Sequence, residues 1–129
     1  MERNTPKRHS GNHVYPLAAG AIIHAGHLVV LEGGYAVPAK AAIDLIAVGR
    51  ANASVNNSSG FAGAASIEVE AGEFRWDNKA DDPVTQAEVG KPCFVIDSCT
   101  VARTDAEGTR SRAGIVRGLD DGGVWVETI

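Results

Sequence analysis

Turn-forming residues interrupt this chain about every 8–12 residues, and this spacing most constrains its fold. Gly accounts for 15 of the 129 residues, well above the roughly 7% of average proteins. The apolar runs between the turns, such as residues 28–31 and 93–96, have the length of strands and are short for helices. Short strands at regular spacing are typical of a sandwich or barrel. We therefore predict a mainly β fold, a compact β-sandwich or barrel-like domain.

Local turn chemistry predicts individual hairpins. Gly33 and Gly34 separate residues 28–31 from residues 35–38, and two consecutive glycines suit a two-residue hairpin loop. Residues 120–123 read Asp-Asp-Gly-Gly and precede a Val-Trp-Val run, which predicts a second hairpin at the end of the chain. If Asp97 and Ser98 form a third two-residue turn, Ile96 lies opposite Cys99.

One short helix is expected. Thr85 lies three residues before Glu88, which is the spacing of a capping box. Pro83 and Gly90 bracket this segment and limit the helix to one or two turns. A single short helix does not supply the crossovers of a parallel α/β sheet.

The first 13 residues differ from the rest. They contain Glu2, Arg3, Lys7 and Arg8 and carry a net charge of +2, whereas the remaining 116 residues carry −6. They have no large apolar side chain after Met1. We therefore predict an extended N-terminal arm over residues 1–13 and a single β-rich domain over residues 14–129.

Bulk charge and hydropathy argue against two classes of partner. The net charge of −4 disfavours nucleic-acid binding, which usually needs a basic face. No run of 18 apolar residues appears, so we expect no membrane span. The first residues contain no apolar stretch like that of a secretory signal, so we expect synthesis and folding in a cytoplasm.

No residue pattern indicates catalysis, a cofactor or a metal site. His24 and His27 are three apart in a strand-like context, which would point them to opposite faces. Cys93 and Cys99 are expected to be free thiols, since disulfides are rare in cytosolic proteins. Trp76 is expected to pack in the core, as is Trp125, because both fit alternating strands. We predict no catalytic, cofactor-binding or metal-binding residues and no enzymatic activity.

The order of short phrases from Val14 to Ile129 resembles the head decoration, or cement, proteins of Mu-like and related siphophages. These phrases are residues 15–20, 25–31, 45–51, 63–76, 88–97, 100–105, 111–116 and 123–127. The resemblance implies a structural virion protein on the outer surface of a bacteriophage capsid. It also implies a trimer at three-fold and quasi-three-fold positions, and it carries no catalytic residues.

These observations lead to a functional hypothesis. We expect a capsid decoration protein that binds the major capsid protein and copies of itself, as a homotrimer or alternatively a dimer. Residues 52–63 are expected to form an exposed loop. The expected contact residues lie in the arm and near this loop: Arg3, Lys7, Arg8, Val55 and Phe61. The alternatives are a small-ligand or carbohydrate-binding β-domain, a tail-associated virion component, and a hydrolase with an unrecognised site.

Overall fold

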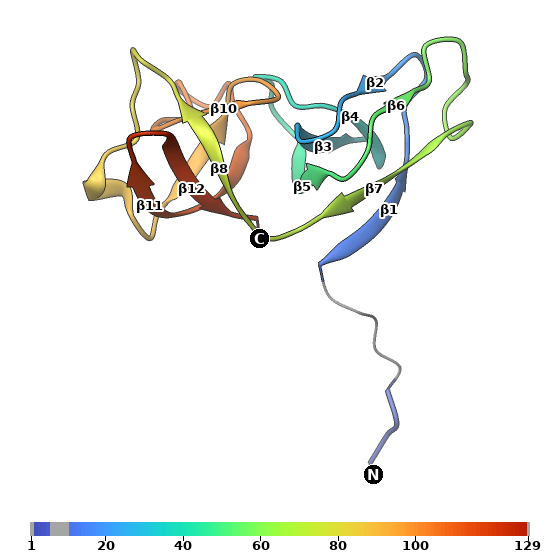
Figure 1. Cartoon of the computed structure of the whole chain (residues 1–129), viewed down its shortest axis with the longest axis horizontal. Coiled ribbons are helices and arrows are strands. Elements are labelled where there is room, and N and C mark those ends of the chain that lie inside the picture. The colour runs from blue at the N-terminus through green and yellow to red at the C-terminus, as the bar shows by residue number, and fades with distance from the viewer. Residues whose placement is uncertain (1, 6–10, 129) are drawn as a thin grey trace.

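The computed structural model of the chain describes residues 2–5 and 11–128. Its mainly β architecture confirms the predicted fold class. Figure 1 shows two β lobes side by side, one formed by β1 to β7 and the other by β8 to β12. The short segment between β7 and β8 connects them.

The first lobe is a five-stranded antiparallel sheet with the order β1-β7-β5-β3-β4. Its strands are β1 (Asn12–Pro16), β3 (Leu28–Glu32), β4 (Tyr35–Pro38), β5 (Ile46–Ala51) and β7 (Ser66–Glu70). A bridge between Leu17 and Ala36 joins the two ends of the sheet, so the sheet curls toward a barrel. A separate two-stranded ribbon pairs β2 (Ile22–Ile23) with β6 (Val55–Asn56).

The second lobe is a closed barrel with the strand order β10-β8-β12-β11-β9. Its strands are β8 (Glu73–Asn78), β9 (Pro92–Val95), β10 (Thr100–Ala102), β11 (Arg112–Asp120) and β12 (Gly123–Glu127). Closure pairs both edges of every strand and leaves none open to association. Gly114 permits the tight packing of β11, because a Cβ there would lie 2.3 Å from the Glu127 carbonyl oxygen.

Strand β3 ties the two lobes together because both of its faces are buried. Val29 belongs to the apolar core inside the first lobe, whereas Leu28 and Val30 pack in a cluster shared with the barrel. The Leu28 N–H also donates a 2.8 Å hydrogen bond to the carbonyl of Ser98 in the barrel. The buried Ser111 hydroxyl adds a second connection, donating to the Ala42 carbonyl at 2.6 Å and accepting from the Leu45 N–H at 3.0 Å.

The structure confirms both glycine-containing hairpins. β3 and β4 are joined by Gly33 and Gly34, whose φ angles of 59° and 89° suit the left-handed residues of a tight hairpin turn. At the other end of the chain, Asp120 pairs with Gly123 across a two-residue loop. Both loops were predicted because their turn chemistry is local.

The third turn was predicted in the wrong register. Val95 pairs with Val101 and Phe94 with Ala102, which sets Ile96 opposite Thr100 instead of Cys99. The loop therefore has three residues, and the Asp97 carboxylate accepts a 2.8 Å hydrogen bond from the Cys99 N–H. This side-chain contact stabilises the longer loop.

Two boundaries also differ from the sequence prediction. Asn12 and His13, assigned to the arm, belong to β1 and pair with Glu70 and Val69. The predicted helix is a single 3₁₀ turn, η1 (Gln86–Glu88). Its capping contact is present, since the Glu88 carboxylate accepts from the backbone N–H and the hydroxyl of Thr85 at 2.7 and 2.6 Å.

Candidate functional site

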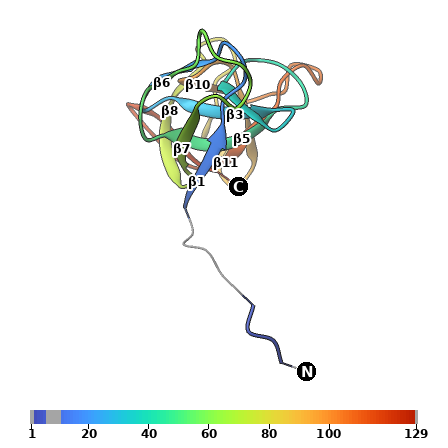
Figure 2. The same ribbon diagram turned by 90° about the vertical axis from the view of Figure 1, so that its right-hand side faces the viewer.

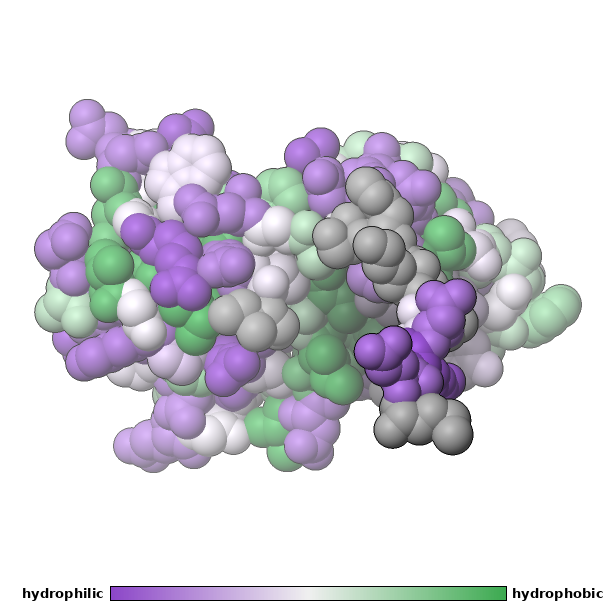
Figure 3. Space-filling view, turned by 90° about the horizontal axis from the view of Figure 1, so that it is seen from below, coloured by the Kyte–Doolittle hydropathy of each residue, from purple (hydrophilic) through white to green (hydrophobic). Residues whose placement is uncertain are grey.

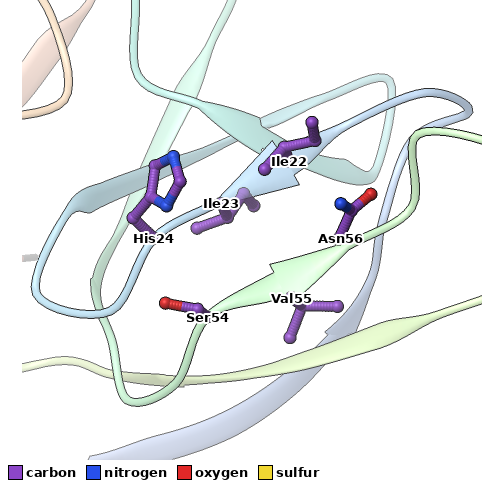
Figure 4. Close-up of a pocket in the computed structure, with 6 residues that line it drawn as sticks. All are labelled: Ile22, Ile23, His24, Ser54, Val55 and Asn56. Carbon is purple, nitrogen blue, oxygen red and sulfur yellow. The ribbon is translucent and has the colours of Figure 1, made fainter.

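A small apolar pocket lies on the two-stranded ribbon of the first lobe. It has a volume of about 160 Å³. Figure 4 shows its six lining residues on the two strands and their flanks: Ile22, Ile23, His24, Ser54, Val55 and Asn56. Its volume is below the roughly 300–1,000 Å³ typical of drug-sized ligand pockets. The pocket therefore suits a protruding side chain of a partner better than a free ligand.

The loop after β6 is fixed by a buried asparagine. Asn57 is only 4% exposed, and its side-chain amide donates to the carbonyls of Ala18 and Phe61 at 3.0 and 3.1 Å. Its backbone N–H donates to the Ala21 carbonyl at 2.8 Å. These bonds hold the loop against the segment that leads into β2. The sequence Asn-Asn-Ser-Ser-Gly is polar, yet this loop has a defined backbone.

This fixed loop carries the most exposed large apolar side chain in the described part of the chain. Phe61 is 77% exposed, although its own carbonyl is held by Asn57. Ile22 on β2 is also exposed. We refer to β2, β6 and residues 57–64 together as the ribbon end. An aromatic side chain held out on an ordered loop is typical of a contact residue at a protein interface.

The predicted contact residues come from different parts of the chain. Phe61 is exposed as expected, but Val55 is half-buried in β6 and faces the pocket, so residues 52–63 are not wholly an exposed loop. Arg3 is exposed and lies in a segment with no strand or helix. Figures 1 and 2 show β6 on the far side of the first lobe from the start of β1, to which the predicted arm leads. Lys7 and Arg8 lie outside the described residues.

Sequence reasoning missed two residues of the ribbon end. Ile22 was not singled out, and its exposure follows from the formation of a two-residue ribbon. Asn57 lies in a polar stretch that resembled solvated loop. The contacts that bury Asn57 against the domain go to residues 18 and 21, which are distant in sequence, so the local sequence does not distinguish it.

Exposed apolar surface is not limited to the ribbon end. Val14, Ile43 and Ile46 are each more than half exposed. Figure 3 shows apolar side chains on the face seen from below, including the region between the lobes. Val14, Ile43 and Ile46 are therefore further candidate contact residues besides Phe61.

The two central histidines are neighbours, which corrects the prediction that they face apart. Their rings lie 5.4 Å apart and meet edge to face. The chain turns at Gly26, whose φ is 84°, and the His27 N–H donates to the His24 carbonyl at 3.2 Å. Within residues 2–5 and 11–128, no three His, Cys, Asp or Glu side chains form a group able to hold a metal ion.

Both cysteines are free and neither is activated. Burial raises the pKa of Cys93 to about 12, so its thiolate is not available near neutral pH. Cys99 is half-buried, and its pKa is raised by burial and by the carboxylates of Asp97 and Asp77. A nucleophilic cysteine needs the opposite shift.

Trp125 lies on the outer surface of the barrel, which corrects the prediction that it packs in the core. Its neighbours on β12, Val124 and Val126, point inward and are buried. The indole N–H donates to Asp120 Oδ2 at 2.9 Å, and the Arg75 guanidinium lies 5.8 Å from the ring centroid. The indole hydrogen bond, with a further one from the Gly122 N–H, lowers the pKa of Asp120. Trp76, by contrast, is buried as predicted.

A polar cluster fixes the loop between β10 and β11. The Asp82 carboxylate accepts from the Thr104 hydroxyl at 2.6 Å and from Arg110 Nη1 at 2.9 Å. The hydrogen bond from Thr104 and the charge and hydrogen bond of Arg110 hold the pKa of Asp82 below its usual range. Both charged groups are satisfied within the fold, which indicates a structural role.

The chain matches no protein-family model, no curated protein and no solved structure. Among the residues that the structure describes, no helix has both the length and the apolar character needed to cross a membrane.

Proposed function

We propose that this protein is a capsid decoration protein, a structural virion component that binds the exterior of a tailed-phage shell and stabilises it. The observation that carries the proposal is Phe61, exposed at 77% on a loop that a buried asparagine holds in place. An exposed aromatic on a fixed loop loses little conformational entropy when it binds. The ordered phrases that resemble siphophage decoration proteins supply the class of partner, the major capsid protein.

The mechanism follows from selective binding. A protein that binds the assembled shell but not its free subunits shifts the equilibrium toward the shell. Each contact can be modest, because many copies act on one particle. Burying a phenylalanine side chain contributes about 2 kcal/mol, which corresponds to about a thirtyfold change in affinity per site. The pocket on the ribbon can accept an apolar side chain from the shell.

The proposal is tested by mixing the protein with expanded empty capsids and measuring co-sedimentation. We expect saturable, stoichiometric binding, weakened at least tenfold by Phe61→Ser. Val89→Ser is the matched control, since Val89 is an exposed apolar residue of the other lobe. If the wild type does not bind, the decoration proposal fails. If Phe61→Ser binds as well as Val89→Ser, the ribbon end is not the contact.

The outer face of the barrel favours a second candidate function, binding of a small ligand or carbohydrate. Trp125 is partly exposed and flanked by Arg75 and Asp120, which together offer an aromatic surface with a donor and an acceptor. Concave pockets are the usual sites for such ligands, and this face has none of the described pocket residues. Quenching or shift of tryptophan fluorescence by a glycan panel, abolished in Trp125→Phe, would favour this function over the first.

A further inference from the structure

His24 and His27 are the first and last residues of a tight turn between β2 and β3. The His27 N–H donates to the His24 carbonyl at 3.2 Å, which closes the turn. Gly26 is its third residue and has a φ of 84°, as a type II turn requires at that position. The first and last residues of such a turn lie close together. The two imidazole centroids are accordingly only 5.4 Å apart.

Three further hydrogen bonds hold this turn against the rest of the first lobe. The Gly26 N–H donates to the Ala51 carbonyl at 2.9 Å, and the Ala51 N–H donates to the His27 carbonyl at the same distance. The Ala25 N–H donates to the Ser54 hydroxyl at 2.9 Å. The backbone of both histidines is therefore fixed before a ligand binds, which lowers the entropic cost of binding.

Both imidazoles can be reached from solvent. His24 is exposed and His27 is half-buried. Figure 4 shows the His24 ring at the end of β2, beside the pocket that this residue lines. A neutral imidazole nitrogen is a common ligand of zinc, nickel and copper ions. Two such rings on one turn therefore supply a pair of metal ligands at the surface.

The separation of the rings matches tetrahedral coordination. A zinc ion lies about 2.0–2.1 Å from a histidine nitrogen, and so about 3.2 Å from the centre of that ring. Two rings at the tetrahedral angle then have centroids about 5.2 Å apart, whereas a right angle gives about 4.5 Å. The observed 5.4 Å is close to the tetrahedral value. Surface side chains change rotamer within nanoseconds, so each ring can direct one nitrogen at a shared ion.

We propose that His24 and His27 form a two-histidine site for a divalent transition-metal ion such as Zn²⁺. In the part of the chain that the structure describes, no third His, Cys, Asp or Glu side chain joins them. The other coordination positions are therefore left to water or to a group from another molecule. A site with open positions differs from a closed structural zinc site, so the ion binds reversibly and the fold does not require it. The inference does not depend on the proposed capsid function.

Isothermal titration calorimetry with Zn²⁺ tests the site. The chain has four histidines, so the titration uses a His9→Gln/His13→Gln background in which only the proposed pair remains. We expect this background to bind one zinc ion per chain, or one per two chains if two pairs share an ion. His24→Gln and His27→Gln, each added to the background, should weaken binding by about tenfold or more.

Cys99→Ser in the same background is the control for a thiol site, and it should bind zinc as tightly as the background does. The proposal is overturned if the background binds no zinc at submillimolar concentration. It is also overturned if both histidine variants bind zinc undiminished.

Thermal unfolding separates a metal site from a merely structural pair. Zinc should raise the Tm of the background, as does any ligand that binds the native state, and magnesium at the same concentration should not. Without zinc, His24→Gln should unfold at the Tm of the background, because its side chain is exposed. A His24→Gln protein that zinc stabilises as much as the background, or equal stabilisation by magnesium, would contradict the inference.

Discussion

The packing of Gly60 against Asn57 makes a quantitative prediction about the loop that carries Phe61. A Cβ atom at position 60 would lie 2.0 Å from Asn57 Oδ1, so Gly60→Ala must displace the asparagine amide. Overpacking of this kind costs about 1–3 kcal/mol. Asn57→Ala removes two hydrogen bonds and leaves the Ala18 and Phe61 carbonyls without their partner. That change should lower the free energy of unfolding by about 2–3 kcal/mol.

The double variant distinguishes this account from two independent defects. Once Asn57 is alanine, the atom that blocks position 60 is gone, and only the Ala64 Cβ at 3.1 Å remains close. Gly60→Ala should then cost less than about 1 kcal/mol, which gives a coupling energy of about 1–2 kcal/mol. Urea unfolding of the four proteins, followed by tryptophan fluorescence, measures the cycle. Additive effects within about 0.5 kcal/mol would refute the contact as the reason for glycine at position 60.

Three further predictions concern the barrel. Gly114→Ala should destabilise the fold by about 3 kcal/mol or more, because residue 114 has a φ of 158° and its Cβ position is blocked. Gly118→Ala in the same strand is the control and should have little effect in thermal unfolding, because the space around Gly118 is open. A thiol reagent at pH 8 should label Cys99 slowly and Cys93 only after unfolding, because burial raises the pKa of both thiols. Rapid labelling of both thiols in the native protein would contradict this burial. Because the pKa of Asp82 is lowered in the fold, its contribution to stability is fully present above the unfolded pKa of about 4 and is lost as the pH falls through the lower folded-state pKa. Asp82→Asn should therefore cost about 2 kcal/mol at pH 7 and progressively less as the pH is lowered below about 4, measured by chemical denaturation at each pH.

The sequence predicted those parts of the fold that depend on local chemistry. The hairpin at Gly33 and Gly34 follows from two residues that adopt positive φ, and the cap at Thr85 follows from a spacing of three. Period-two alternation predicted the strand through Trp125 but not its orientation. Alternation shows that Trp125 and Val124 face opposite ways, and only barrel closure determines which of them is buried.

The candidate site was predictable only in part, for the same reason. Phe61 was identified because an aromatic residue in a small polar stretch has no obvious core position. Its support by Asn57 depends on a segment some 40 residues earlier in the chain. The proximity of His24 and His27 likewise required knowing that the chain turns at Gly26 and does not run straight.

The most direct test of the decoration proposal compares genome-filled heads with and without this protein. Heads that lack it should assemble but release DNA at a lower temperature, or after less magnesium chelation, than decorated heads. Adding back the wild-type protein should restore the stability, and adding Phe61→Ser at the same concentration should restore less. Undecorated heads that withstand heat and chelation as well as decorated ones would contradict the account.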